Sequence, residues 1–331
     1  MEAENSKSKL NQNNDLLPEK VEEAIKKIIK KEGYTDYKLN TKAISTGGGN
    51  YFGSLYEVDV VGVTKDGEKE TNIFVKGIIP ADHLTAVSVT GMFNMELFFY
   101  NDLAVVLNDI QNEADVPIKE RYNIAKSFQE SIREAIILDN LAKKGYKTLS
   151  RFDVLPINFA ELCVKRLGKL HALSFALENK RPDYFDQNIK TIPCPYNFNE
   201  DFKVDYQLMH YGCPLLDFFF LIFLGTDQQF RKYHLKDLKD IYFDSLTKML
   251  QYFDINIKFV FPRDDFENLY NETLGYGLQC FIQLMPFIFA TENEVPDLDK
   301  DYQGEVNIKT DPRMNERARG IVDDFIQWGV L

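Results

Sequence analysis

The sequence predicts an α+β protein of two lobes, in which the first lobe holds a small antiparallel sheet with helices and the second lobe is mainly helical. Two observations lead to this prediction. Between Tyr37 and Lys76 apolar residues alternate with polar ones, which is the spacing of strands, whereas beyond Gly145 they recur every three or four residues, which is the spacing of helices. The length of 331 residues also suits two domains of roughly 150 residues each.

The elements of the first lobe follow one another in a clear order. An amphipathic helix is predicted over 18–33, because a proline opens it, acidic residues come early, lysines come late and a glycine ends it. Short strands come next, with a hairpin turn at residues 66–67, where the sequence reads Asp-Gly. A second helix at about 90–106 and an apolar strand at 135–138 complete the lobe.

The second lobe carries several helical patterns and one stretch without periodicity. Three prolines interrupt residues 179–201, so this stretch is predicted to be a loop or linker. The apolar run 218–224 is predicted to be a buried segment. Helices are predicted at 159–173, 235–253, 264–290 and 313–328. The expected divisions of the chain are a disordered tail at 1–15, a first lobe at 16–141 and a helical second lobe at 142–331.

Composition excludes several classes of protein. Hydrophobic residues make up 44% of the chain and charged residues 27%, values far from those of a disordered protein. The formal net charge is −12 and no basic stripe opposes it, so we expect no nucleic-acid partner. The four cysteines form no Cys-x-x-Cys pair, which disfavours a zinc or redox motif. With no apolar signal segment and no run near the ~20 residues of a membrane span, we expect a cytoplasmic protein.

A glycine-rich segment precedes one of the predicted strands. Glycines between two strands allow backbone N–H groups to approach an anion closely, as they do in phosphate-binding loops. Three adjacent glycines are more often only a turn, so this alternative stays open for the segment taken alone. The candidate phosphate-binding residues here are Gly47, Gly48, Gly49 and Asn50.

Two charged side chains after this segment favour a phosphate-binding site over an ordinary turn. Lys76 ends a predicted strand and points away from its apolar neighbours, although a strand-end lysine is usually just solvated. Glu96 lies among apolar residues of the next helix, where an unpaired carboxylate would be costly. A glycine-rich hairpin, a strand lysine and a helix glutamate, in this order, form the nucleotide-clamping half of a kinase-type site, with Glu96 holding Lys76 on the phosphates.

The second lobe supplies a candidate metal ligand. A short predicted strand places Asp205 where a metal-binding carboxylate would lie, and the alternative is an ordinary aspartate at a turn or strand end. Asp217 follows and leads into the apolar run. Aromatic residues of this lobe are candidates for lining a lipophilic pocket, although aromatic side chains are more often part of the core. They are Tyr206, Tyr211, Phe218, Phe219 and Tyr276.

In combination, segments from most of the chain resemble one known family. They are residues 49–51, 74–76, 96–100, the hinge-like 137–141, 145–146, 167–172, 204–207, Gly212, Pro214 and Asp217. With them the chain resembles the ecdysteroid kinase-like, or CHK kinase-like, proteins of insects, which are relatives of choline kinases and aminoglycoside phosphotransferases.

The resemblance implies a protein-kinase-like fold that transfers the γ-phosphoryl group of ATP, with Mg²⁺, to a hydroxyl group of a small molecule. It assigns the phosphate role to Lys76, the ion-pair role to Glu96 and the metal role to Asp205, and it places Leu138 and Asn140 in a nucleotide-binding hinge. The expected cofactors are therefore ATP and Mg²⁺. The expected partners are a nucleotide and a small lipophilic alcohol such as a steroid.

The chain departs from this family at the catalytic loop, which in the family reads His-Gly-Asp-x-x-x-x-Asn. By the resemblance, the linker at 179–201 is shortened, because this segment is expected there and is missing. None of the four histidines is followed by x-Asp, so no catalytic residue is assigned, and His171 on its apolar stripe is expected to be a core histidine. A positioned general base is worth about 10²- to 10⁴-fold in rate, so we expect impaired or absent catalysis. Two interpretations stay open: a kinase whose gene model or splice form lacks the segment, and a pseudokinase that binds a nucleotide or a lipophilic ligand.

Overall fold

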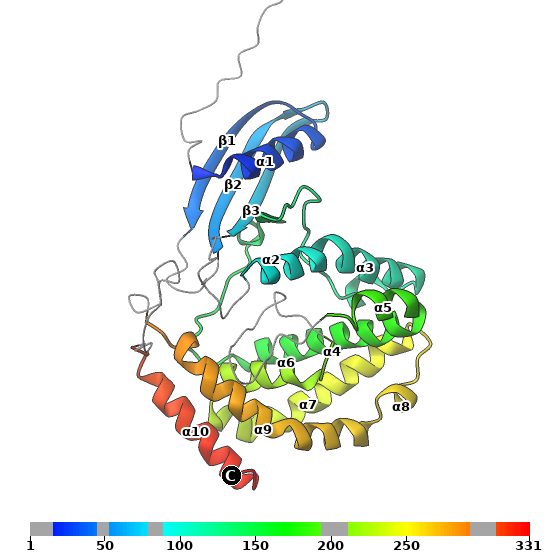
Figure 1. The fold of residues 1–331 in the computed structure, drawn as a ribbon, viewed down its shortest axis with the longest axis vertical. Coiled ribbons are helices and arrows are strands. Elements are labelled where there is room, and N and C mark those ends of the chain that lie inside the picture. Colours follow the sequence, from blue (N-terminus) through cyan, green and yellow to red (C-terminus); the bar gives the residue numbers. More distant parts are fainter. Residues whose placement is uncertain (1–15, 45–52, 79–88, 193–210, 292–308) are drawn as a thin grey trace, which may run out of the picture. The chain divides into compact units, whose positions relative to one another are not determined.

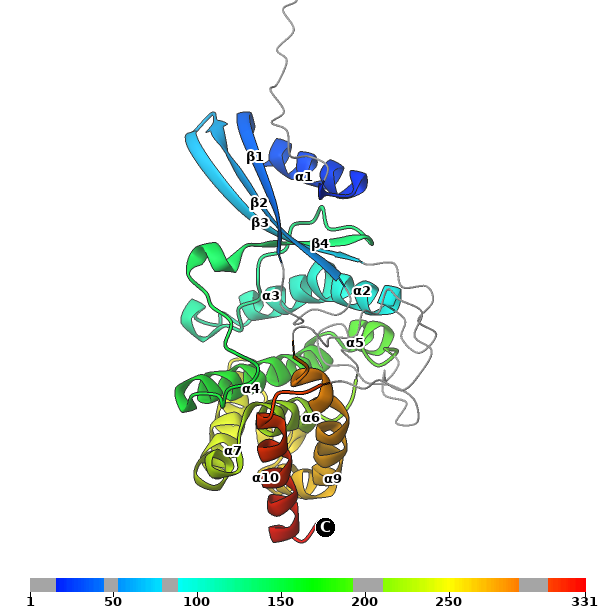
Figure 2. The same cartoon turned by 90° about the vertical axis from the view of Figure 1, so that its left-hand side faces the viewer.

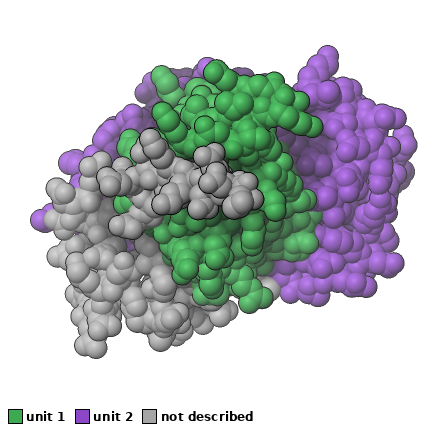
Figure 3. Space-filling model, turned by 90° about the horizontal axis from the view of Figure 1, so that it is seen from above, with its two compact units in different colours: residues 1–103, 124–147, 297–303 green, residues 104–123, 148–296, 304–331 purple. Residues whose placement is uncertain are grey.

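The computed structural model divides the chain into two units, each assembled from separated stretches of sequence (Figure 3). The residues that it describes are 16–44, 53–78, 89–192, 211–291 and 309–331. Unit 1 comprises 1–103, 124–147 and 297–303, and unit 2 comprises 104–123, 148–296 and 304–331. The small antiparallel sheet lies in the first unit and the long helices lie in the second, so the predicted α+β fold with a sheet-bearing part and a helical part is confirmed.

Unit 1 is built on an antiparallel sheet whose strands lie side by side in chain order (Figures 1 and 2). Its hairpin turn is the predicted one, since Thr64 pairs with Gly67 across the turn. Gly67 has a φ of +116°, a backbone conformation that residues other than glycine rarely adopt. The strands are β1 (Tyr34–Ile44), β2 (Gly53–Thr64), β3 (Gly67–Ile78) and β4 (Ala135–Asp139).

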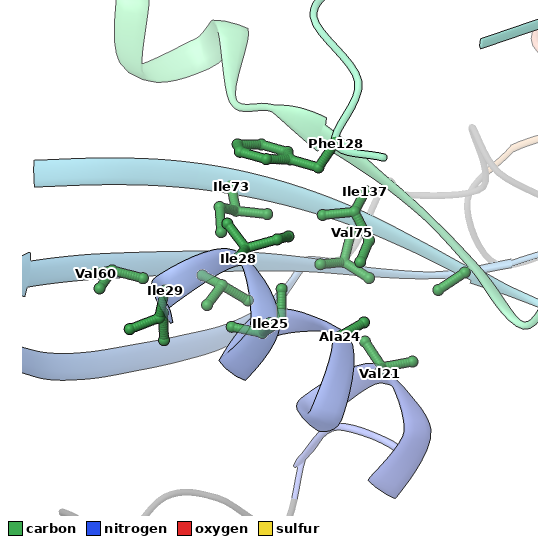
Figure 4. Close-up of a cluster of buried hydrophobic side chains, with 12 residues drawn as sticks. Val21, Ala24, Ile25, Ile28, Ile29, Val60, Ile73, Val75, Phe128 and Ile137 are labelled. Carbon is green, nitrogen blue, oxygen red and sulfur yellow. The ribbon is translucent and has the colours of Figure 1, made fainter. Parts of the chain in front are cut away.

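The predicted first helix is confirmed as α1 (Glu19–Lys31), which lies across one face of the sheet (Figures 1 and 2). Acidic residues occupy its first turn and lysines its last, in agreement with the helix dipole. Each aliphatic side chain that is fully buried in the shared core contributes roughly 1.5–3 kcal/mol. Figure 4 shows this core, in which Val21, Ala24, Ile25, Ile28 and Ile29 of the helix meet Val60, Ile73, Val75, Phe128 and Ile137.

The second predicted helix is longer than expected and is interrupted by a wide turn. The stretch consists of α2 (Val89–Phe98), a π-helix η2 (Phe99–Leu103) and α3 (Ala104–Glu113). A π-helix adds residues to one turn and therefore shifts the phase of the buried positions, which is why a pattern with a single helical period predicted a shorter element. The chain passes from unit 1 to unit 2 at the end of this π-helix.

Unit 2 consists of helices, and the four long ones that the periodicity predicts are confirmed as α4, α7, α9 and α10. The first two approach so closely that a Cβ on Gly168 of α4 would lie 2.6 Å from the carbonyl oxygen of Tyr242 on α7. No helix in the part of the chain described here is both long and apolar enough to cross a membrane. The helices are α4 (Ile157–Lys180), α5 (Pro182–Asn188), α6 (Leu215–Phe219), α7 (Gln228–Gln251), α8 (Ile257–Val260), α9 (Arg263–Ile288) and α10 (Arg313–Gln327).

The stretch 179–201, predicted to be a loop, is partly helical. The first two residues belong to the end of α4, and α5 follows at once. Pro182 occupies the first turn of α5, where a proline is favourable because the N–H that it lacks has no partner within the helix. The prediction was wrong for α5 because it treated this proline as a helix breaker. Residues 193–201 lie outside the described part.

The apolar run 218–224 is buried, as predicted. It forms the end of α6 and a second π-helix, η6 (Phe220–Leu224). Phe218 and Phe219 are almost completely buried, so for these two the core interpretation is confirmed. Tyr211 and Tyr276 are exposed, and Tyr206 lies outside the described residues.

A dependence of stability on pH follows from the residues just before α10. Hydrogen bonds from Arg313 lower the pKa of Asp311 to about 2. Because this folded-state pKa lies below the ordinary value of 3.8, the charged form stabilises the fold above pH ~4, and this stabilisation is lost as the pH falls toward 2. We expect Asp311→Asn to lower the urea midpoint at pH 6 and to approach the wild-type midpoint near pH 2. Asp323→Asn, on the exposed side of α10, is the control, and a difference between Asp311→Asn and wild type that stays constant over this range would contradict the prediction.

Candidate functional site

A buried ion pair in unit 1 is the centre of the candidate site. Lys76 lies on β3, and its Nζ donates to Oε2 of Glu96 on α2 over 2.7 Å. The Lys76 side chain is 12% exposed and that of Glu96 is 6% exposed, so the lysine is not an ordinary solvated strand-end residue. Its ammonium also lies 5.7 Å from the centre of the Phe93 ring, within the range of a cation–π contact.

The pair forms because α2 packs on the sheet face that carries Lys76. Phe93 and Leu97 of the helix contact Ile136 and Leu138 of β4. This packing brings Glu96 into an apolar environment, where a carboxylate without a cation would be expensive. The sequence therefore brings together two charges that are 20 residues apart, and the surrounding apolar contacts fix the direction in which the ammonium points.

The hinge-like segment lies next to the site at the end of β4. Leu138 is partly buried and pairs with Phe74 on β3. Asn140 is 2% exposed, and its Oδ1 accepts from the backbone N–H of Ala142 at 3.1 Å, so its side chain caps the short 3₁₀-helix Leu141–Lys144. Its backbone N–H donates to the carbonyl oxygen of Asn72 at 3.0 Å, which extends the pairing of β3 and β4 into the hinge.

Acidic side chains lie on the same sheet face near the hinge. The Nζ of Lys143 donates to Oδ2 of Asp59 at 2.9 Å. This hydrogen bond raises the pKa of Lys143, and the nearby carboxylates of Glu57 and Glu70 act in the same direction. The hinge is thus tied to β2 by a surface ion pair that the sequence alone does not indicate.

The structure does not describe the remaining residues that were predicted to form the site. Gly47, Gly48, Gly49 and Asn50 lie outside the described residues, as does Asp205. Within the described ranges, no group of three or more His, Cys, Asp or Glu side chains is arranged to hold a metal ion. The structure therefore brings together Lys76 and Glu96, and it places Leu138 and Asn140 at the hinge.

A polar chain in unit 2 was missed by the sequence analysis. His171 is buried, as predicted, and its Nδ1 lies 2.7 Å from Oη of Tyr242 while its Nε2 lies 3.2 Å from Oδ2 of Asp217. Complete burial raises the pKa of Tyr242, so this phenol stays protonated and can donate to Nδ1 while Nε2–H donates to the carboxylate. The three residues come from three helices without a characteristic spacing, so no local signal reveals the chain. Its effect is to orient the Asp217 side chain, which is 55% exposed.

Comparison with known proteins gives one match. The sequence model of the ecdysteroid kinase-like family matches residues 47–204 and 197–255, which together span well over half of the chain. The first matched stretch contains Lys76 and Glu96, and the two stretches overlap at 197–204. No curated protein and no solved structure matches.

Proposed function

This chain belongs to the ecdysteroid kinase-like family, and on that premise we propose that it binds ATP with Mg²⁺ but transfers phosphate poorly or not at all. Its fold is α+β and kinase-like, with a four-stranded antiparallel sheet in unit 1 and a helical unit 2. The proposed role is that of a pseudokinase, a nucleotide-binding or lipophilic-ligand-binding module in the cytoplasm. The lipophilic ligand is an alcohol such as a steroid.

The observation that carries the proposal is the buried pair of Lys76 and Glu96. An ammonium has three N–H donors, so one lysine can bind a carboxylate and phosphate oxygens together. In this arrangement Glu96 holds the ammonium in one direction and Lys76 neutralises the negative charge of the nucleotide phosphates. Because the Lys76 ammonium is largely shielded from water, its attraction for a phosphate is stronger than that of a solvated lysine.

Other residues complete the proposed nucleotide site. The backbone N–H groups of Gly47, Gly48, Gly49 and Asn50 would cradle phosphate oxygens, and Asp205 would hold the metal. When bound, Mg²⁺ supplies positive charge that neutralises the phosphates. The segment from Leu138 to Asn140 would border the nucleotide, with the Asn140 side chain supporting the hinge through its cap on the 3₁₀-helix.

Two observations support the loss of catalysis. The sequence contains no His-Gly-Asp-x-x-x-x-Asn segment, and the family match falls into two stretches that meet at 197–204, in the interval where that segment is expected. His171 does not replace the missing base, because both of its ring nitrogens are engaged by Tyr242 and Asp217. Loss of a positioned base alone lowers the rate by about 10²- to 10⁴-fold.

We expect phosphoryl transfer from γ-labelled ATP to steroid alcohols or to choline to stay at the level of spontaneous hydrolysis. The reason is that the sequence lacks the His-Gly-Asp-x-x-x-x-Asn segment, whose aspartate would accept the proton of the attacking hydroxyl. The measurement is thin-layer separation of labelled product with purified protein and Mg²⁺. Transfer that requires Mg²⁺ and disappears in Lys76→Ala protein made in the same way would contradict the prediction.

The division of the family match into two stretches also favours a second candidate function, in which a longer transcript encodes an active kinase. Sequencing of transcripts across the codons for residues 179–201 distinguishes the two. An in-frame exon encoding His-Gly-Asp-x-x-x-x-Asn supports the active kinase, whereas uninterrupted transcripts support the pseudokinase.

A further inference from the structure

The two edges of the sheet in unit 1 differ in what lies beside them. At the edge formed by β4, the backbone N–H of Phe128 donates to the carbonyl oxygen of Ile137 at 2.8 Å. The backbone N–H of Asp139 donates to the carbonyl oxygen of Lys126 at 2.9 Å, so the chain itself covers this edge. The other edge is β1, which within the described ranges pairs with β2 alone. Such an edge presents a row of N–H and C=O groups that can pair with another strand.

The strand β1 is long enough to accept a second strand. It has 11 residues and no proline, and its pairing with β2 is regular from Asp36 to Ile44, after a shift of register between Tyr34 and Asp36. The core beneath α1 draws its buried strand residues from β2, β3 and β4, whereas β1 contributes only the partly buried Tyr34 and Leu39. The cover that α1 provides is therefore centred away from this edge.

Charged side chains along β1 restrict which strand fits this edge. Asp36, Lys38 and Lys42 are exposed, and their even spacing places them on one face of the strand. Neither Asp36 nor Lys42 forms an ion pair with another described residue. Lysines on an edge strand usually prevent pairing with an arbitrary strand. A strand that carries its acid and its lysines in the reverse order would instead be attracted, and an antiparallel copy of β1 has that order.

The charges also favour one register for two antiparallel copies of β1. With Leu39 opposite its own copy, Asp36 of each strand lies opposite Lys42 of the other, and side chains directly opposite are close enough to form an ion pair. Centring the pairing one residue earlier would place Lys38 opposite its own copy. Centring it one residue later would place Lys38 opposite Lys42. Like charges directly opposite each other destabilise a strand pair, so both of these registers are disfavoured.

We propose that β1 joins two copies of this chain into a symmetric dimer, in which the β1 strands pair antiparallel about Leu39 and the two sheets become continuous. The inference goes beyond the proposed function, because it requires neither a nucleotide nor the pair of Lys76 and Glu96. Pairing over 36–42 supplies about six to eight backbone hydrogen bonds. Both copies use the same surface, so the contact closes with two chains. The edge at β4 is already covered, so the assembly does not grow further.

Sedimentation velocity of the full chain over a concentration series up to about 100 µM tests the proposal, and we expect a reversible monomer–dimer equilibrium. Asp36→Lys places lysines opposite each other in the dimer, and Lys42→Asp places aspartates opposite each other. Each variant alone should dimerise roughly 10- to 100-fold more weakly than wild type. An equimolar mixture of the two should form a heterodimer with about the wild-type affinity, because every lysine of one chain then faces an aspartate of the other.

Glu68→Lys is the matched control, because it makes the same change of charge at an exposed residue of β3, away from the β1 edge, and should leave dimerisation unchanged. The double variant Asp36→Lys with Lys42→Asp exchanges the charges within one chain and should recover the wild-type affinity, even if a single variant folds poorly. Wild type that stays monomeric over the whole series would overturn the proposal. So would assemblies larger than two chains, single variants that dimerise like wild type, or a mixture that stays monomeric.

Discussion

Replacing Lys76 with alanine is expected to weaken Mg-ATP binding by about 10- to 150-fold, because a hydrogen bond to a charged group contributes about 1.5–3 kcal/mol. The ammonium is the one described side chain that the proposed function places on the phosphates, and Glu96 holds it at 2.7 Å. Calorimetric titration of Mg-ATP into wild type and Lys76→Ala measures the effect. A loss of less than threefold would show that Lys76 does not bind the phosphates.

The same substitution has a second effect that must be separated from the first. Removing the lysine leaves the Glu96 carboxylate buried without this cation, and breaking a buried pair in this way costs about 3–5 kcal/mol of stability. The double variant Lys76→Met with Glu96→Leu removes both charges and is expected to recover most of the stability without recovering nucleotide binding. If the double variant bound Mg-ATP like wild type, the ion pair would be only a structural feature of unit 1.

Replacing Arg231 with methionine is expected to lower the free energy of unfolding of unit 2 by about 3–5 kcal/mol. Arg231 on α7 is 2% exposed, and its Nε donates to Oδ2 of Asp324 on α10 at 2.6 Å. It also donates from Nη1 to the carbonyl oxygen of Thr226 at 2.8 Å. Burial lowers the pKa of Arg231, and the hydrogen bond and charge of Asp324 oppose this shift. The buried arginine therefore depends on Asp324 to keep its charge.

Urea unfolding followed by the fluorescence of Trp328, the single tryptophan of the chain, measures this effect. Arg231→Met combined with Asp324→Leu should recover much of the loss, because no unpaired charge stays buried. The control is Lys236→Ala on the same helix, where the lysine of the pair with Asp240 is 86% exposed and should contribute less than about 1 kcal/mol. A loss for Arg231→Met no larger than that of the control would contradict the prediction.

The parts of the fold that could be predicted from the sequence are those in which a local pattern decides the structure. The amphipathic period of α1 and the Asp66-Gly67 turn are local signals, and both were confirmed. The meeting of Lys76 and Glu96 was also expected, because a carboxylate among apolar residues requires a cation and a lysine precedes it on a strand. What these residues bind stays a prediction.

The features that the sequence did not indicate depend on contacts between distant elements. His171 meets Asp217 because α4 and α6 pack together, and the spacing of these residues in the sequence does not indicate that contact. The side chain of Asn140 caps a short helix, which its place in the hinge motif does not reveal. The helix α5 was missed because a proline can open a helix as readily as it can end one, and only the neighbouring structure decides which.

Because of the π-helix η2 (Phe99–Leu103), one helical stretch buries side chains in both units of the chain. Before it, Phe93 is buried and Leu97 is partly buried against the sheet of unit 1, and after it Leu107 and Ile110 are buried in a segment that belongs to unit 2. Each residue of an α-helix advances the side chains by about 100° around the axis. Deleting a single residue from this turn would therefore rotate α3 relative to α2, so that if Glu96 kept its lysine, Leu107 and Ile110 would point in the wrong direction.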